Sequence, residues 1–164
     1  MQRLFFYGVL LVLVISCKQE KKEVAQEVVS TFEIDNTAWP KKVAIDSKVK
    51  PIIVDWKEFD ALEDSFDALY TVENTEDLTL VIEDLEVKQK ALAKSRFPKE
   101  FDLPQIKGRL TLFNTFLLKV KGDLYYRLDV QDSVLEMINA YNALRNQFTI
   151  IVNNTLDKNL ILEE

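Results

Sequence analysis

Hydrophobic residues recur every three or four positions from residue 55 onward, a spacing that predicts amphipathic α-helices. Polar and proline-containing breaks divide this pattern into four segments. Short connections between helices favour antiparallel neighbours. The pattern therefore predicts an all-α fold, an antiparallel up-down four-helix bundle over residues 55–160, with helices at about 55–73, 75–97, 103–128 and 130–159.

Side chains that can cap helices occur at three of these breaks. Asn74 and Asp102 are expected to cap the second and third helices, and Asp129 the fourth. The apolar stripe of the third helix stays in phase past Gly122, so we expect this helix to continue to about Leu128, at a cost of about 1 kcal/mol for the interior glycine. The alternative is a break at Gly122.

Residues 24–54 lack a clear period. Trp39-Pro40 and Lys50-Pro51 favour extended backbone before each proline. The β-branched run 52–54 could form a strand, but no second convincing strand follows for it to pair with. We therefore predict an extended N-terminal arm that precedes the bundle, with Trp39 and residues 52–54 packed on the helices.

The first seventeen residues form a separate apolar segment. Arg3 precedes the apolar run 4–15, which is shorter than the roughly 20 residues of a membrane-spanning helix and has the layout of a secretory signal. Its end, Val14-Ile15-Ser16-Cys17, resembles the lipobox of bacterial lipoproteins. The resemblance implies removal of residues 1–16 and lipidation of Cys17. The alternative is a plain secretory signal followed by an incidental cysteine.

A polar tract, Lys18 to Glu23, follows the cysteine and is expected to act as a tether within residues 17–54. An Asp directly after the Cys retains many Gram-negative lipoproteins in the inner membrane, and this chain has Lys18 there. The resemblance therefore implies the outer membrane of a bacterial cell envelope. Its periplasmic and surface faces both stay open, because charged tracts at this place also resemble surface-export signals.

Composition narrows the chemistry that the chain can perform. Without residues 1–16, the remaining 20 basic and 27 acidic residues give a formal charge of −7, which disfavours nucleic-acid binding. The sequence has no histidine, and its one cysteine is the predicted lipid carrier, so the common triads and histidine or thiolate metal sites are absent. We expect no cofactor, no metal and no enzymatic activity. The expected partners are the membrane, through Cys17, and an envelope protein.

The four arginines that follow residue 16 all lie on or near the apolar lines of their helices. Glu63 and Glu73 are the matching acidic residues of the first helix. Antiparallel packing places Glu73 near Arg127 and Glu63 near Arg145, and we predict these two interhelical ion pairs. The alternative function is a ligand-binding module that recognises an anionic or sugar ligand, with candidate contacts Arg127, Tyr141, Asn142 and Arg145.

The last predicted helix also carries a narrow polar row at three- and four-residue spacing: Asn139, Asn142, Asn146, Thr149 and Asn153. This row is interpreted as a solvated or interhelical hydrogen-bonding edge, or as a recognition face for another helix or a glycan. The stretch 139–148 resembles small helical lipoproteins that carry a name taken from viral A-type inclusion proteins, a resemblance that implies no activity. The favoured function is a non-enzymatic interaction or structural module of the envelope.

Overall fold

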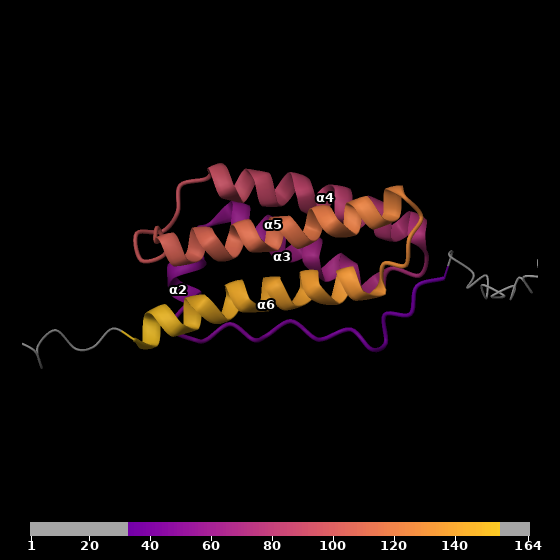
Figure 1. The fold of residues 1–164 in the computed structure, drawn as a ribbon. Helices are drawn as coiled ribbons and strands as arrows, with labels where there is room; N and C mark the ends of the chain where they lie inside the picture. Colours follow the sequence, from indigo (N-terminus) through magenta and orange to yellow (C-terminus); the bar gives the residue numbers. More distant parts are fainter. Residues whose placement is uncertain (1–32, 155–164) are drawn as a thin grey trace, which may run out of the picture.

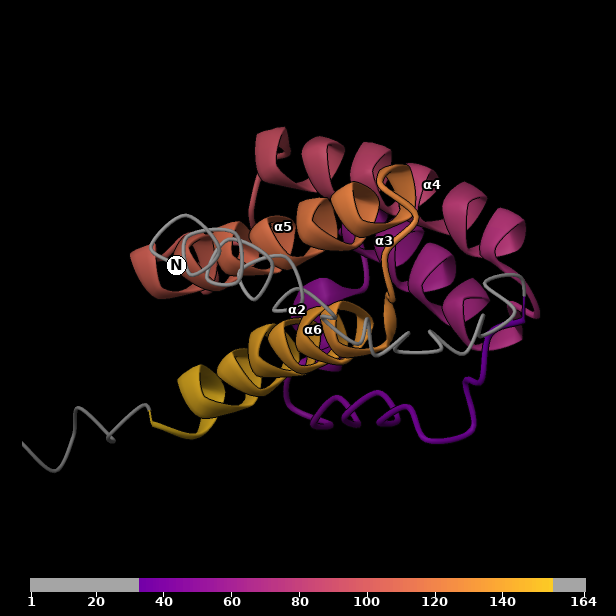
Figure 2. The same cartoon turned by 45° about the vertical axis from the view of Figure 1, so that its right-hand side comes forward.

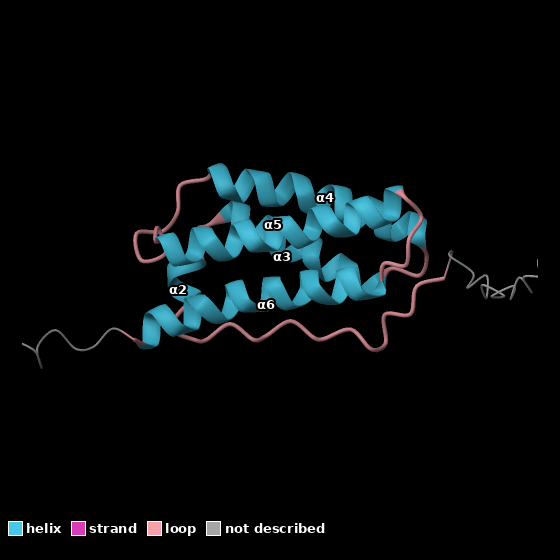
Figure 3. Cartoon of the chain, viewed as in Figure 1, coloured by secondary structure: helices cyan, strands magenta, loops and turns pink. Residues whose placement is uncertain are grey.

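A computed structural model describes residues 33–154, and this part of the chain is all-α, as predicted (Figure 3). The predicted signal segment, Cys17 and the predicted polar tether lie outside the described residues, as does the end of the predicted last helix. Within residues 33–154 the structure contains five α-helices, one short 3-10 helix and no strand, with the bounds α2 Lys50–Ile53, α3 Lys57–Ala68, η1 Leu69–Thr71, α4 Thr75–Lys94, α5 Pro104–Tyr125 and α6 Gln131–Asn153.

The four long helices lie side by side along most of their lengths (Figure 1). α3 contacts α4, α4 contacts α5, and α5 contacts α6. Their apolar faces enclose one core that is rich in aromatic side chains, and Phe59, Phe66, Phe113, Tyr141 and Phe148 are fully buried in it. The spacing of apolar residues thus identified the faces that pack together.

The helix starts agree with one of the three predicted caps. The Asn74 side chain accepts a hydrogen bond from the backbone of Asp77, at 2.8 Å, and α4 begins directly after it. The predicted cap at Asp129 is wrong, because α6 begins one residue later, after Val130, which makes no side-chain cap; Asp129 accepts a hydrogen bond from the backbone of Gln131, at 2.9 Å, from the position before the cap. The predicted cap at Asp102 is wrong, because α5 begins one residue later, after Leu103, and Asp102 instead pairs with Lys107 at 2.5 Å.

Helix α5 passes through Gly122 without a break, as the apolar stripe predicted. It ends at Tyr125, three residues before the predicted end. Arg127 adopts φ 55°, and the Leu128 backbone N–H bonds to the Asp123 carbonyl at 2.8 Å. A left-handed residue cannot continue an α-helix, so the chain turns here towards α6.

Residues 33–49 contain no helix and lie along α6, on the side of the molecule away from α4 and α5 (Figures 1 and 2). We call them the N-terminal segment. Trp39 is buried in the core, as expected. The run 52–54 does not continue the extended backbone, because α2 begins at Lys50 with Pro51 in its first turn, where the missing N–H leaves no bond unmade. Ile53 is buried there, whereas Val54 is exposed.

Candidate functional site

Glu63 of α3 lies at the centre of a group of polar side chains between α3 and α6. Arg145 Nη1 donates to Glu63 Oε2, which is the interhelical ion pair that the helix faces predicted. The Tyr141 hydroxyl donates to the other carboxylate oxygen, Oε1. The Arg145 side chain is 7% exposed and that of Glu63 17%, so the pair is largely removed from water.

A lysine from the N-terminal segment completes this group. Lys42 Nζ lies 3.1 Å from Glu63 Oε2 and 2.6 Å from Asp67 Oδ1. We call Lys42, Glu63, Asp67, Tyr141 and Arg145 the Glu63 cluster. Its two cations and two carboxylates balance, which lowers the cost of holding charges away from water. The sequence did not reveal Lys42, because an extended segment has no helical face to which a side chain can be assigned.

Tyr141 connects the Glu63 cluster to the aromatic core. Its ring stacks on Phe66 with the centroids 3.9 Å apart, and the Arg145 guanidinium lies 5.9 Å from the Tyr141 centroid. Burial, followed by the charge of Glu63 and the hydrogen bond to it, raises the pKa of Tyr141 well above 10. The phenol therefore stays protonated and acts as a hydrogen-bond donor to Glu63.

Side chains of α6 and η1 bind the backbone of the N-terminal segment. Asn142 accepts from the Val43 N–H at 2.8 Å and donates to the Lys41 carbonyl at 3.0 Å, while Arg145 Nε donates to the Val43 carbonyl at 2.7 Å. The Tyr70 hydroxyl donates to the Pro40 carbonyl at 2.7 Å. These bonds replace the partners that a neighbouring strand would supply to an extended backbone.

The polar row of α6 therefore contains residues that bind the N-terminal segment and residues that are exposed to solvent. Asn142 binds the N-terminal segment, and Asn153 bonds to Lys48 at 2.8 Å and to Asp46 at 3.4 Å. Asn139 and Asn146 are exposed. Within residues 33–154, the partner that this row binds is the chain's own N-terminal segment.

The second predicted ion pair does not form. Among the described residues no ion pair joins Glu73 to Arg127, because Arg127 belongs to the turn after α5 and both side chains are exposed. Arg96 and Arg109 are also exposed, so only Arg145 occupies the core-side position predicted for the arginines. The other arginines were predicted near the edge of the apolar face of their helices, and from that edge a long side chain reaches water.

The predicted ligand contacts are likewise separated. Tyr141, Asn142 and Arg145 lie together, but Arg127 lies in the turn between α5 and α6 and takes no part in the Glu63 cluster. The polar atoms of the first three are bonded to Glu63 and to the N-terminal segment. The structure thus gives these side chains partners within the chain.

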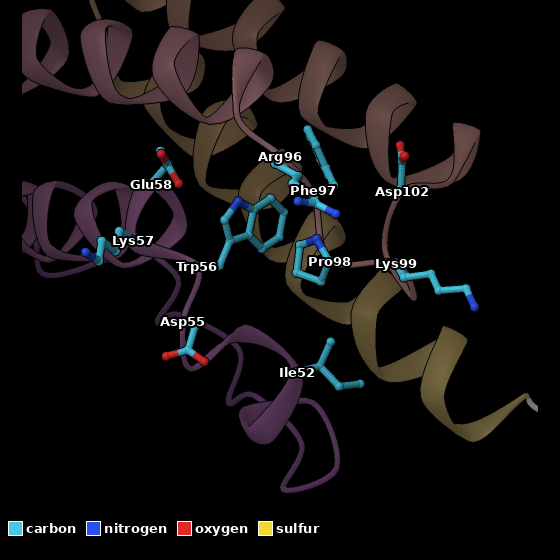
Figure 4. Close-up of a pocket in the computed structure, with 10 residues that line it drawn as sticks. All are labelled: Ile52, Asp55, Trp56, Lys57, Glu58, Arg96, Phe97, Pro98, Lys99 and Asp102. Atoms are coloured by element: carbon cyan, nitrogen blue, oxygen red, sulfur yellow. The ribbon is translucent and has the colours of Figure 1, made fainter.

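An open cleft of about 830 Å³ lies elsewhere, between the α2–α3 corner and the connection from α4 to α5 (Figure 4). Trp56, Phe97 and Pro98 form its apolar walls, and Arg96 lies beside them. Trp56 is held by a 2.9 Å bond from Nε1 to Ser95 Oγ and by the Phe97 ring, 4.9 Å away. Sequence patterns missed this cleft because helices and connections far apart in the chain form it.

Residues 33–154 contain no group of three or more His, Cys, Asp or Glu side chains arranged to hold a metal ion. In the same range, no helix has both the length and the apolarity needed to cross a membrane.

Comparisons with protein-family models, curated proteins and solved structures gave no significant match. The Glu63 cluster is best suited to fastening the N-terminal segment to α3 and α6.

Proposed function

We propose that this chain is a lipid-anchored, non-enzymatic module of the bacterial cell envelope that acts as a structural or interaction protein. Its lipid is carried on Cys17 of the lipobox-like sequence, and the outer membrane is its location. Its architecture is an antiparallel up-down four-helix bundle, preceded by an extended N-terminal arm. The sequential contacts of α3 with α4, α4 with α5 and α5 with α6 support this architecture.

The observation that carries a non-enzymatic role is the internal use of the buried polar groups. Glu63 receives Lys42, Tyr141 and Arg145 together, and Arg145 also holds the Val43 carbonyl. Catalytic groups need access to a substrate, whereas these groups bond to one another and to the N-terminal segment. A ligand at Tyr141, Asn142 and Arg145 would have to displace that segment, so the geometry favours an interaction or structural module over a ligand-binding one.

Lipidation is tested by metabolic labelling with palmitate. The parent chain is expected to incorporate the label and to lose residues 1–16, while Cys17→Ser should remain unlabelled and unprocessed. Normal labelling of Cys17→Ser would contradict the assignment. In intact cells, an added protease should cleave the protein only if it lies on the outer surface, which decides between the two faces of the membrane.

The interaction role is tested by affinity capture from detergent-solubilised envelope. After chemical cross-linking, a specific envelope protein should be recovered with the parent chain in repeated experiments. The matched control is an unrelated lipoprotein of similar size and charge, which corrects for capture through the lipid. Recovery of the same set of proteins with both baits would count against an interaction module.

A further inference from the structure

Two tyrosines and a leucine at the turn between α5 and α6 are unusually exposed. Tyr125 is 80% exposed, Tyr126 71% and Leu128 57%, and we call these three residues the tyrosine tip. The two rings contact each other edge to face, with centroids 5.0 Å apart. The left-handed Arg127 between them and Leu128 turns the backbone here. Large side chains that stay exposed together are typical of an interaction surface.

The tyrosine tip lies at the end of the molecule where the described chain begins (Figure 1). Glu33 forms a bridge with Asn74, directly before α4. Gln131, at the start of α6, donates to the Asp35 carbonyl at 3.3 Å. Residues 17–33 can span at most about 55 Å when extended. An anchor on Cys17 would therefore hold the molecule within about that distance of the membrane, with the chain attached at the same end as the tyrosine tip.

We propose that the tyrosine tip contacts the headgroup region of the membrane, a proposal that rests on the lipid anchor of the proposed function. Tyrosine suits this region, because its ring is apolar and its hydroxyl can bond to water and headgroups. The partner is a zwitterionic lipid surface. An anionic surface would be repelled, because the exposed acidic residues at the same end of the molecule outnumber the exposed Arg127 of the turn: Glu33, Asp35, Glu73, Asp129 and Asp132.

The experiment uses residues 17–164, coupled through the sole cysteine, Cys17, to a maleimide lipid in phosphatidylcholine vesicles. Coupling supplies an anchor whether or not cells lipidate Cys17, so this test and the palmitate test can fail independently. Tyr125→Trp places a reporter in the tyrosine tip. The native Trp39 and Trp56 are 3% and 4% exposed and supply a constant background. The added emission should shift to shorter wavelength on coupling and be quenched by bromine-labelled acyl chains.

Val87→Trp is the matched control, because Val87 is 61% exposed on α4 and lies outside the tyrosine tip. Its emission should stay at long wavelength and unquenched. Equal quenching of the two reporters, or quenching of neither, would overturn the proposal. Replacing part of the phosphatidylcholine with an anionic lipid should weaken the Tyr125→Trp response. A stronger response would overturn the choice of a zwitterionic surface.

Discussion

At the scale of single residues, the Glu63 cluster decides how the N-terminal segment meets the helices. Removing one partner from a buried pair costs more than forming the pair contributes, because the remaining charge keeps its desolvation cost. Glu63 bonds to Arg145 from α6, to Lys42 from the N-terminal segment and to Tyr141. The cluster therefore favours one arrangement of three segments over its alternatives.

Arg145→Met is expected to lower the free energy of unfolding by about 3 kcal/mol, the lower end of the range for breaking a buried pair, because Lys42 still faces Glu63. Urea denaturation monitored by circular dichroism measures the loss. Arg127→Met is the matched control, since Arg127 is exposed, and it should change stability by less than about 0.5 kcal/mol. Equal stability of the two variants would show that the Arg145 pair contributes nothing.

Tyr141→Phe tests the raised pKa of the phenol. Because this pKa is higher in the folded chain than the ordinary value of 10, the unfolded chain loses its proton first as pH rises. The stability that Tyr141 contributes is thus complete below pH 10 and falls above it. The parent should lose stability more steeply than Tyr141→Phe as the pH rises above about 10.

Tyr70→Phe provides a comparison for that titration. Burial and the charge of Asp67 also raise the pKa of Tyr70, but this side chain is only half-buried. Its removal should flatten the alkaline slope less than Tyr141→Phe does. Identical slopes for the parent and Tyr141→Phe would mean that the phenol does not titrate differently in the two states.

At the scale of the elements, α5 shows how a helix accommodates an interior glycine. The interior Gly122 of α5 is tolerated because the apolar stripe continues on both sides of it. A Cβ at Gly122 would meet nothing within 4 Å, so no close contact requires glycine at this position. The glycine therefore carries only its cost in backbone entropy.

Gly122→Ala is accordingly expected to stabilise the protein by about 0.5–1 kcal/mol. Thermal unfolding should show a higher midpoint, and Gly108→Ala should behave similarly, since a Cβ there also meets nothing within 4 Å. A lower midpoint for Gly122→Ala would indicate that another molecule approaches the backbone closely at this position.

The N-terminal segment depends on individual side chains of α6. Asn142→Ala removes both of its bonds to the segment, so the Val43 amide should exchange its hydrogen faster with solvent. Asn139→Ala is the matched control from the same polar row, because Asn139 is exposed. Hydrogen exchange followed by mass spectrometry should show faster exchange over residues 40–46 only in Asn142→Ala. Unchanged exchange in both variants would contradict a fastening role for Asn142.

At the scale of the whole molecule, one core is surrounded by an acidic surface on which ion pairs join neighbouring helices. Glu86 of α4 bonds to Lys121 of α5 at 2.5 Å and also to Lys90. The bonds from Lys121 and then Lys90 lower the pKa of Glu86 below 4.5. A lowered pKa contributes stability above the unfolded value and loses it as pH falls.

Acidification below about pH 4.5 should therefore destabilise the parent chain more than the Glu86→Gln variant. Urea denaturation at pH 7 and pH 3 gives the two differences. Glu100→Gln is the control, since Glu100 is exposed and lies in the connection between α4 and α5. If Glu86→Gln loses as much stability on acidification as the parent does, the bond between Glu86 and Lys121 is too exposed to water to contribute to stability.

The sequence by itself determined the features that depend on neighbouring residues in the chain. The all-α class follows from apolar residues repeating at the period of the helix, and the Asn74 cap follows from a side chain beside its own backbone. The Glu63–Arg145 pair was also predictable, because both residues interrupt apolar faces that must meet. The limit of this reasoning is visible at Asp102, where local signals misplaced the start of α5 by one residue.

Only the tertiary structure decided how the N-terminal segment is bound. Lys42 reaches Glu63, and Val43 reaches Asn142, across long separations in the chain, which no local period encodes. The same holds for Arg127, whose distance from Glu73 depends on where α5 ends and the chain turns. The physical reason is that helical periodicity assigns a side chain to a face, while the partner of that face depends on how distant segments pack.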